Sequence, residues 1–503
     1  MRGLRTPVSE IRSKIFTEVA KLAYEGDYAK LNDSVERIPY EVCPGDVPSY
    51  RESIYRERAI AAERVRLAMG MSLRPEDKPV HVTSGLEESN VAEKYYEPPL
   101  MQVIPSACNL CEDKKFEVSN MCQGCIAHPC MQVCPRGAIS HDKTGKSHID
   151  QEKCIKCGRC KESCPYDAIA KKERPCSKAC GVGAIGTDEY GRAQIDPSVC
   201  VSCGMCMVSC PFGAIADKSQ IFQLIRCMQT GGEVIAEIAP AFVGQFGVDA
   251  TPRNVKAALL ELGFSEVVEV ALGADIGAVA EAHHYARHVA NGELPFLLTS
   301  CCPAWSMLAK TQFPEIIESV SAELTPMVAT ARSIKKEHPQ AKVVFIGPCA
   351  AKKLEASRRT VRSDVDFVIT FEELAAMFAA KGIDPNHTEG DSSMHDATAA
   401  GRGYAYAGGV ADAIEACVRE YYPDVEVKIE HAEGLAECKR VLMLAKAGKK
   451  QGYMIEGMGC PGGCVAGAGT ILPVSKAKAE VSKLQKASTK QLPPKELREI
   501  ELD

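Results

Sequence analysis

Five cysteines in three widely separated segments constrain the fold of this chain more than any other feature. The segments read TSCCPAW (299–305), GPCAAKKLE (347–355) and EGMGCPGGCVAGAG (456–469). Four thiolates are enough to hold one 4Fe-4S cubane, because soft cysteine ligands bind such clusters and four is their usual number. The fifth cysteine stands next to a ligand, where a titratable thiol can carry protons. The fold must therefore bring three distant loops to one place.

The three segments resemble the signature motifs of the catalytic domain of FeFe-hydrogenases. The resemblance implies that four cysteines hold the cubane of an H-cluster, namely Cys302, Cys349, Cys460 and Cys464. It implies that Cys464 also bridges to a two-iron subsite that carries carbonyl, cyanide and an azadithiolate bridge. Cys301 would pass protons to that bridge and Lys352 would hold a cyanide. Glu355 and Met458, from the same motifs, complete the candidate catalytic residues.

The resemblance also implies a proton route, which in the family runs outward from the free cysteine through a Glu, a Ser and a second Glu. Glu281 and Ser321 stand at the matching positions before and after Cys301. The outer Glu is replaced by His284, which either keeps the relay, because histidine titrates near neutral pH, or slows turnover. A second departure is Gly347 in place of the usual Met, and we expect it to remove a bulky wall near the two-iron subsite.

Cysteine usage in the rest of the chain indicates further metal sites. The chain has 25 cysteines among 503 residues, many at C-x2-C spacing, and its start lacks the apolar run and cleavage site of a signal peptide. We therefore expect thiolate–metal sites in a reducing cytoplasm instead of disulfides. The net charge of -6 argues against a nucleic-acid partner. No apolar run approaches the roughly 18 residues of a membrane span, so we expect no membrane partner either.

An internal repeat of 46 residues lies between Cys108 and Cys210. Both copies contain the bacterial ferredoxin pattern C-x2-C-x2-C-x3-C-P, as CIKCGRCKESCP (154–165) and CVSCGMCMVSCP (200–211). In this pattern the fourth cysteine binds the neighbouring cluster. An equivalent set begins at Cys122, with two extra residues between its second and third cysteines. A duplicated ferredoxin-like unit is the simplest interpretation.

The sharing rule groups sixteen cysteines into four cubane sites. One site takes Cys134, Cys154, Cys157 and Cys160, and its neighbour takes Cys122, Cys125, Cys130 and Cys164. A third takes Cys180, Cys200, Cys203 and Cys206. The fourth would take Cys108, Cys111, Cys176 and Cys210, with an orphan upstream C-x2-C crossing between units. The alternative is that Cys108 and Cys111 bind nothing and this cluster is missing, because spacing alone does not fix connectivity.

Four regions follow from these patterns: a helical N-terminal segment (1–100), the duplicated ferredoxin-like domain (101–217), a catalytic domain (218–475) and a C-terminal tail (476–503). In the first region we expect helices over 8–20, capped by Ser9, and over 51–69. In the third we expect strands at 233–239, 342–346 and 365–369, and a helix at 254–262 closed by Gly263. The expected fold class is an α/β catalytic domain with the H-cluster between two lobes, preceded by α+β ferredoxin-like modules and the N-terminal helices.

The predicted function is that of a soluble FeFe-hydrogenase, with an H-cluster and about four additional 4Fe-4S clusters. The expected partners are a ferredoxin or similar low-potential electron carrier and the hydrogenase maturation proteins. A dihydrogen-sensing hydrogenase is one alternative, although no signalling domain is evident. A non-catalytic iron–sulfur assembly or electron-transfer protein is another, although such a protein would not be expected to keep Cys301, Lys352, Glu281 and Ser321 together.

Overall fold

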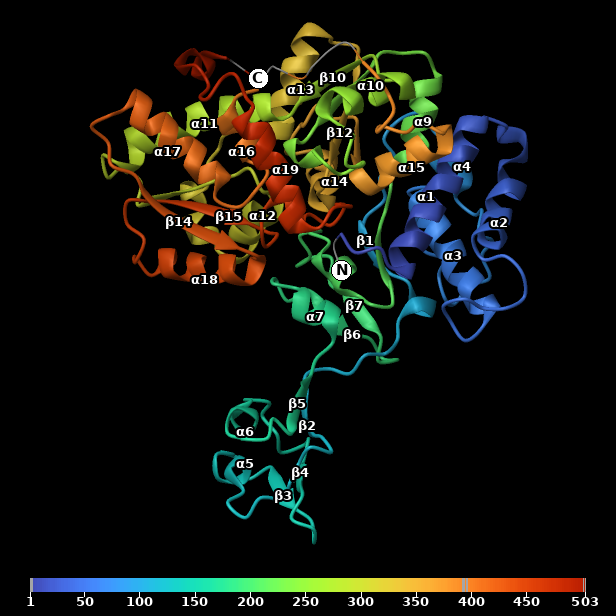
Figure 1. The fold of residues 1–503 in the computed structure, drawn as a ribbon, viewed down its shortest axis with the longest axis vertical. Coiled ribbons are helices and arrows are strands. Elements are labelled where there is room, and N and C mark those ends of the chain that lie inside the picture. The colour runs from blue at the N-terminus through green and yellow to red at the C-terminus, as the bar shows by residue number, and fades with distance from the viewer. Residues whose placement is uncertain (1–2, 391–393, 395–396, 501, 503) are drawn as a thin grey trace.

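The N-terminal part of the computed structural model, which describes residues 3–390, 394, 397–500 and 502, is helical (Figure 1). Its helices are α1 (Pro7–Glu25), α2 (Leu31–Val42), α3 (Ile54–Ala68) and α4 (Leu86–Ser89). Thr6, and not the expected Ser9, caps α1, because Thr6 Oγ1 accepts the backbone N–H of Ser9 and Ser9 Oγ accepts that of Thr6. The apolar face of α1 packs against α9 (Ile221–Gln229) and α15 (Phe371–Lys381). The N-terminal helices therefore cover one side of the catalytic domain.

The sequence repeat is also a structural repeat. The first copy contains α5 (Pro129–Gln132), β3 (Ile139–His141), β4 (Ser147–Ile149), α6 (Arg159–Glu162) and β5 (Ile169–Lys172). The second contains α7 (Pro175–Ala179), β6 (Ile185–Thr187), β7 (Ala193–Ile195), α8 (Met205–Ser209) and β8 (Ile215–Asp217). The hairpins β3–β4 and β6–β7 pair in the same antiparallel register, with Ile139 opposite Ile149 and Ile185 opposite Ile195. The two copies thus have one fold.

One copy is inserted into the other. Strand β5 pairs with β2 (Lys115–Val118), and β8 pairs in the same antiparallel way with β1 (Met101–Val103). The C-x2-C at Cys108 follows β1 just as the C-x2-C at Cys122 follows β2. The orphan cysteine pair therefore belongs to the second copy. The expectation that it crosses between units is wrong, because β1, which precedes it, pairs with β8 of the same copy. We call residues 112–173 the arm and residues 101–111 with 174–217 the inner module.

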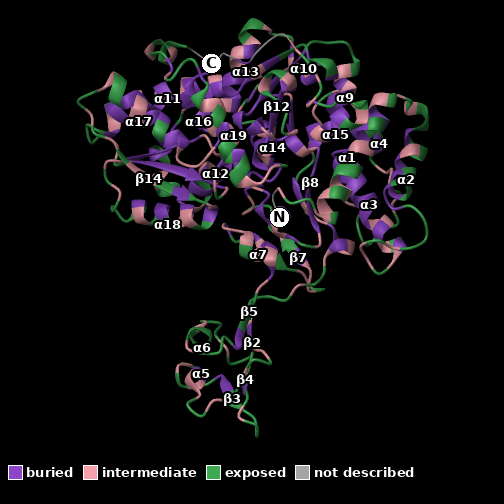
Figure 2. Ribbon diagram, viewed as in Figure 1, coloured by how far each residue is buried: buried purple, intermediate pink, exposed green. Residues whose placement is uncertain are grey.

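The arm extends away from the rest of the molecule, with α5, α6, β3 and β4 at its far end (Figure 1). Most of its ribbon is exposed or intermediate in Figure 2. Its buried core is small, with Phe116, Ile139 and Ile169 packed around Cys130 and Cys160. Such a core is too small to stabilise a module of this size alone, so the arm depends on metal ligation for a defined fold.

The catalytic domain contains two parallel sheets. The larger has the order β10–β9–β12–β13, formed by Glu266–Glu269, Val234–Ile238, Lys342–Gly347 and Phe367–Thr370. The smaller has the order β11–β15–β14, formed by Phe296–Leu298, Tyr453–Met458 and Lys428–Glu433. The central strands are rich in Val, Ile and Phe and buried along their length, as in parallel sheets that helices cover on both faces.

The covering helices are α10 (Pro252–Leu262), α11 (Ala271–His284), α12 (Pro303–Gln312), α13 (Pro326–Glu337), α14 (Ala350–Ser357), α16 (Ala399–Gly403), α17 (Gly409–Tyr421), α18 (Leu435–Lys446) and α19 (Val474–Lys486). Gly263 ends α10 in a left-handed conformation, as predicted. The region expected as a tail begins inside α19, which packs on α16 and buries Ala477 and Val481 completely. Residues 476–486 therefore belong to the catalytic fold. No described helix is both long and apolar enough to cross a membrane.

A buried network of charges joins three parts of the chain. The ammonium group of Lys353 on α14 donates to Asp217 at 2.7 Å and to Glu373 at 2.8 Å. Arg12 on α1 donates to Glu372 at 2.7 Å. Burial alone would raise the pKa of Asp217, but Lys353 and Arg12 lower it below its usual range. The network holds the end of the inner module and helix α1 against the catalytic domain.

Candidate metal centre

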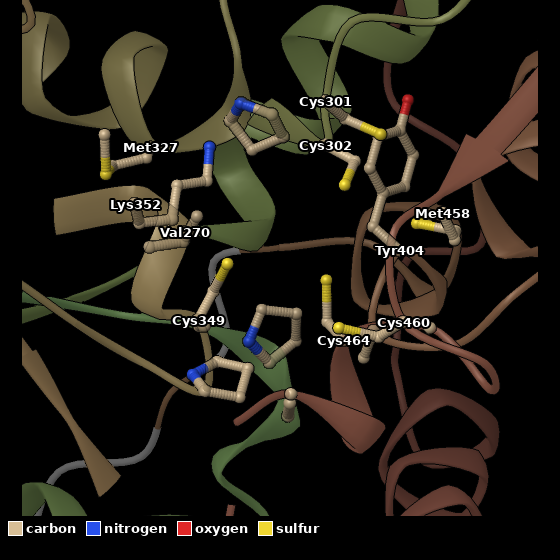
Figure 3. Close-up of a pocket in the computed structure, with 18 of the residues that line it drawn as sticks. Val270, Cys301, Cys302, Met327, Cys349, Lys352, Tyr404, Met458, Cys460 and Cys464 are labelled. Carbon is tan, nitrogen blue, oxygen red and sulfur yellow. The ribbon is translucent and has the colours of Figure 1, made fainter. Parts of the chain in front are cut away.

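A cavity between the ends of the two sheets collects the cysteines of the three motifs (Figure 3). Its volume is about 80 Å³. The cavity is lined by Cys301, Cys302, Cys349, Cys460 and Cys464, together with Lys352 and Met458. In Figure 3 the sulfur atoms of Cys302, Cys349 and Cys464 point into the same space. Loops that lie far apart in the sequence therefore converge on one site.

Each cysteine loop leaves the carboxyl end of a parallel strand, which is where open α/β sheets usually bind ligands. Cys301 and Cys302 follow β11, Cys349 follows β12, and Cys460 follows β15. Cys302 and Cys349 are also the N-caps of α12 and α14. The start of a helix favours negative charge, so both positions suit a thiolate.

The thiols of this cavity do not ionise easily on their own. Burial, with repulsion from neighbouring cysteines, raises the pKa of Cys349 to about 11 and that of Cys464 to about 12. The same causes raise the pKa of Cys460 well above its ordinary value. Thiolates here therefore need a bound cation, which an iron–sulfur cluster supplies. A backbone N–H of Gly459 already points at Cys302 Sγ, 3.3 Å away, as cluster sulfurs require. The donor set fits a cluster.

Lys352 and Glu355 form a buried ion pair at the edge of the cavity. Lys352 Nζ donates to Glu355 Oε2 at 2.6 Å. Burial opposes the charge on the lysine, but Glu355 more than compensates and raises the pKa of Lys352. Near this pair, burial raises the pKa of Glu237 well above its usual range. Burial therefore favours the neutral form of Glu237, and Glu355 is the ion-pair partner of Lys352, which lines the cavity.

The wall expected to be missing at Gly347 is supplied by another residue. A Cβ atom added at Gly347 would lie 2.5 and 2.6 Å from ring atoms of Phe345, so the ring occupies the space of a side chain at 347. Phe345 lines the cavity directly. The expectation that Gly347 opens the site is therefore wrong, because the chain replaces the wall from two residues earlier on the same strand.

Tyr404 was missed by the sequence analysis. It lines the cavity, and its side chain lies close to Cys301 in Figure 3. The hydroxyl is buried and has no hydrogen-bond partner in the described part of the chain. Leaving such a group unpaired costs on the order of 1–3 kcal/mol. In Figure 3 the hydroxyl points past Cys301 and away from the space into which the cysteine sulfur atoms point, so the ring and not the hydroxyl faces the cavity.

Glu281 and Ser321 lie together behind Cys301. The Ser321 hydroxyl and the backbone N–H of Ser300 both donate to the Glu281 carboxyl. Burial is the main reason that the pKa of Glu281 rises to about 7, with Glu323 adding repulsion. The pKa of Cys301 is also raised well above its ordinary value, first by burial and then by Glu281. A protonated thiol therefore lies next to a carboxyl that exchanges protons near neutral pH.

The next group outward from Ser321 is Glu323, which the sequence analysis also missed. The backbone N–H of Glu323 donates to Ser321 Oγ at 3.2 Å, and Ser300 Oγ donates to the Glu323 carbonyl at 2.9 Å. Glu323 is only partly buried, and burial raises the pKa of its carboxyl. His284 instead lies against His288, with ring centroids 4.9 Å apart, and burial lowers its pKa. The only advance signal of Glu323 was its position two residues after Ser321.

The predicted ferredoxin-like ligand sets also come together. Three small pockets are each lined by one predicted set: Cys134 with Cys154, Cys157 and Cys160; Cys122 with Cys125, Cys130 and Cys164; and Cys108 with Cys111, Cys176 and Cys210. In the set without such a pocket, burial raises the pKa of Cys206 most, and Cys180, Cys200 and Cys203 raise it further. Within the described residues, no three His, Cys, Asp or Glu side chains meet closely enough to hold a single ion. The spread of the thiols suits a multi-iron cluster better than one ion.

The backbone of the disputed Cys108–Cys111 loop matches that of the other cluster loops. In the first C-x2-C of each of the four ligand sets, the residue before the second cysteine has a positive φ: Leu110 (51°), Gly124 (62°), Lys156 (57°) and Ser202 (54°). This conformation is unusual for residues other than glycine. Backbone N–H groups also point at Cys154 Sγ and Cys200 Sγ, each at 3.4 Å. The shared turn favours the fourth cluster over the alternative that Cys108 and Cys111 bind nothing.

The inner module meets the cavity directly. Cys349 lies close enough to Cys203 to raise its pKa, and Cys203 in turn raises the pKa of Cys460. A Cβ atom at Gly204 would lie 2.5 Å from the side chain of Ala468, so only glycine allows this approach. The Cys180–Cys206 set therefore lies beside the cavity.

The fold and the site define an iron–sulfur protein in which ferredoxin-like modules lead to a buried cysteine-lined cavity. The profile of the iron only hydrogenase large subunit, C-terminal domain, matches residues 232–468, and 4Fe-4S binding domains match residues 147–170 and 193–216. The periplasmic [Fe] hydrogenase large subunit of Nitratidesulfovibrio vulgaris is 30% identical in an alignment of 374 positions that covers 65% of this chain and 87% of that protein. The chain belongs to the FeFe-hydrogenase family.

Other similarities cover shorter parts. Iron hydrogenase 1 of Clostridium pasteurianum is 28% identical over 50% of this chain, and the match spans about half (51%) of that relative. One solved structure, whose title describes stepwise [FeFe]-hydrogenase H-cluster assembly in HydA(deltaEFG), aligns with this chain at 22% identity and a TM-score of 0.43. The alignment covers 53% of this chain and 89% of the chain in that structure. The cytosolic Fe-S cluster assembly factor NAR1 of Kluyveromyces lactis is 38% identical over 99 residues, 19% of this chain and 21% of that protein. Family membership alone therefore does not decide the activity.

Proposed function

We propose that the protein is an FeFe-hydrogenase that interconverts dihydrogen with two protons and two electrons. The observation that carries the proposal is the meeting of four cysteines, a fifth free cysteine and the Lys352–Glu355 pair at one buried cavity. Cys302, Cys349, Cys460 and Cys464 would hold the H-cluster there. When bound, its two-iron part supplies the centre at which dihydrogen is formed or split, which no side chain can do.

The residues around the cavity provide orientation and proton transfer. The Lys352 ammonium group, held in place by Glu355, would donate a hydrogen bond to a cyanide. Met458 and Phe345 line the cavity with apolar surface and limit the entry of water. The Cys301 thiol stays protonated at neutral pH and would deliver its proton at Sγ. Glu281 would reload it and would itself receive protons through Ser321 and Glu323.

Electrons would travel through about four 4Fe-4S clusters. The set formed by Cys180, Cys200, Cys203 and Cys206 would be the last before the cavity, because Cys203 lies near Cys349 and Cys460. The three sets that line small pockets would extend the path through the inner module into the arm.

Maturation with the two-iron cofactor, followed by measurement of dihydrogen production from a reduced viologen dye, tests the proposal. We expect activity, carbonyl and cyanide infrared bands, and roughly 22 iron atoms per chain, from four iron atoms per cubane and six in the H-cluster. A fully loaded protein without dihydrogen chemistry would favour the second candidate, a non-catalytic relative of the assembly-factor type. Because the proposed activity requires maturation with the two-iron cofactor, hydrogenase maturation proteins are proposed partners. A cytoplasmic location stays a prediction, and one relative is named as periplasmic.

A further inference from the structure

The two ferredoxin-like copies present different side chains at equivalent positions. Five cations of the arm have uncharged counterparts 46 residues later in the inner module. The cations are Arg136, Lys153, Lys156, Arg159 and Lys161, and the counterparts are Val182, Val199, Ser202, Met205 and Met207. Because the two copies share one backbone fold, these positions form the same face of each, around the C-x2-C-x2-C loop.

In the inner module this face is packed against the catalytic domain. Val182 packs in one apolar cluster with Trp305 and Leu435 of the catalytic domain. Met205 and Met207 pack in another with Ala350 and Ala468, next to the ligand loops of the cavity. The same face carries Cys203, which lies near Cys349. The apolar residues of this face are therefore explained by its permanent contact with the catalytic domain.

In the arm the same face is open to solvent. All five cations are exposed, and so is the ligand candidate Cys157. Ile155, the counterpart of the buried Val201, is 54% exposed. Lys153 has a solvent-exposed ion pair with Asp150 at 3.3 Å, and the part of the chain that the structure describes provides no ion pair for the other four. Glu152 and Glu162 are the acidic residues within the same loop and helix, so the face has a net positive charge.

We propose that this cationic face (Arg136, Lys153, Lys156, Arg159 and Lys161) is the docking site of a small acidic iron–sulfur electron carrier. The inference rests on the proposed function, because it assumes that electrons enter or leave through the clusters of the arm. Complementary charge accelerates the encounter of transient redox partners and orients them, while an exposed apolar centre such as Ile155 gives close contact. The projection of the arm from the body leaves room for a second protein (Figure 1).

The test compares the loaded, full-length protein with a variant that carries Arg136→Gln, Lys156→Gln, Arg159→Gln and Lys161→Gln. A matched control carries Lys14→Gln, Lys310→Gln, Lys449→Gln and Lys476→Gln, which removes four exposed positive charges elsewhere. An acidic two-cubane ferredoxin is the protein carrier and a reduced viologen dye is the small-molecule donor. We expect the arm variant to raise the KM for the ferredoxin at least fivefold and to flatten the decline of kcat/KM with ionic strength. The control set and the dye-driven rate should stay within about twofold of the native protein.

Three results would overturn the docking site: an unchanged KM in the arm variant, an equal effect of the control set, or a rate with ferredoxin that increases with salt. Titration of the iron–sulfur-loaded protein with ferredoxin measures the affinity without turnover. Loss of affinity in the arm variant of a protein that shows no dihydrogen chemistry would therefore support the docking face while contradicting the proposed hydrogenase activity.

Discussion

Replacing Glu281 with Gln should slow dihydrogen production by about 10²–10⁴-fold, the usual contribution of a positioned general acid or base. Glu281 is buried behind Cys301, and both Ser321 and Ser300 donate hydrogen bonds to its carboxyl. Gln keeps the size of the side chain and the carbonyl oxygen that accepts these bonds. It has no proton to transfer, so the change isolates proton delivery from packing.

The raised pKa of Glu281 sets the expected pH dependence. An ordinary glutamic acid with a pKa of 4.5 is protonated about 0.3% of the time at pH 7. With a pKa of about 7, Glu281 is protonated about half of the time, so its donor form is roughly 150-fold more abundant. The donor form predominates below pH 7 and is lost above it. Dihydrogen production should therefore fall as the pH rises through about 7, while oxidation, which needs the basic form, should rise.

The assay is dihydrogen production from a reduced viologen dye between pH 5.5 and 9, with iron content and infrared bands as checks of equal loading. The variant Glu323→Gln should lose about tenfold or more, because it removes the partly exposed end of the route. The matched variant His284→Ala should stay within about twofold. Native-like turnover in Glu281→Gln, or a large loss in His284→Ala with none in Glu323→Gln, would refute this route.

Three further predictions concern packing and metal content. Lys353→Met should lower the free energy of unfolding by about 3–5 kcal/mol in thermal unfolding, because it leaves buried carboxylates unpaired. The control Lys342→Met, at a more exposed ion pair, should cost less than about 1 kcal/mol. Equal effects of the two variants would contradict the buried network. Gly347→Met should cost about 1–3 kcal/mol and reduce cofactor loading by overpacking against the Phe345 ring, and a second change of Phe345→Ala should restore loading. Replacing Cys108 and Cys111 together with Ala should lower the iron content by about four atoms per chain; an unchanged iron content would show that the fourth cluster does not exist.

Features that depend on residue spacing or hydrophobic periodicity could be predicted from the sequence. The strands that lead to Cys349 and the helix that ends at Gly263 appear where β-branched runs and a C-terminal glycine predict them. The grouping of the cysteines also follows from spacing, because each C-x2-C loop can wrap only one corner of a cluster. These are local properties of the chain, and local sequence specifies them.

The features that escaped prediction depend on contacts between distant segments. Phe345 fills the space at Gly347 only because its ring lies along the strand, next to Gly347. Tyr404 reaches Cys301 across the fold, and no motif surrounds it. The insertion of one ferredoxin-like copy into the other is visible only when β8 is seen to pair with β1, a strand of the same copy that lies on the other side of the arm in the sequence. Pairing partners are a tertiary property, so the orphan cysteines looked misplaced in the sequence.

The insertion has a consequence for how such proteins change length. The arm begins and ends at adjacent points, since β2 and β5 run side by side with Lys115 opposite Lys172. A cassette with neighbouring ends can be excised or exchanged while the host module keeps its own strands and cysteines. A chain of this family can therefore gain or lose one ferredoxin-like copy at the end far from the cavity, while the catalytic domain stays unchanged.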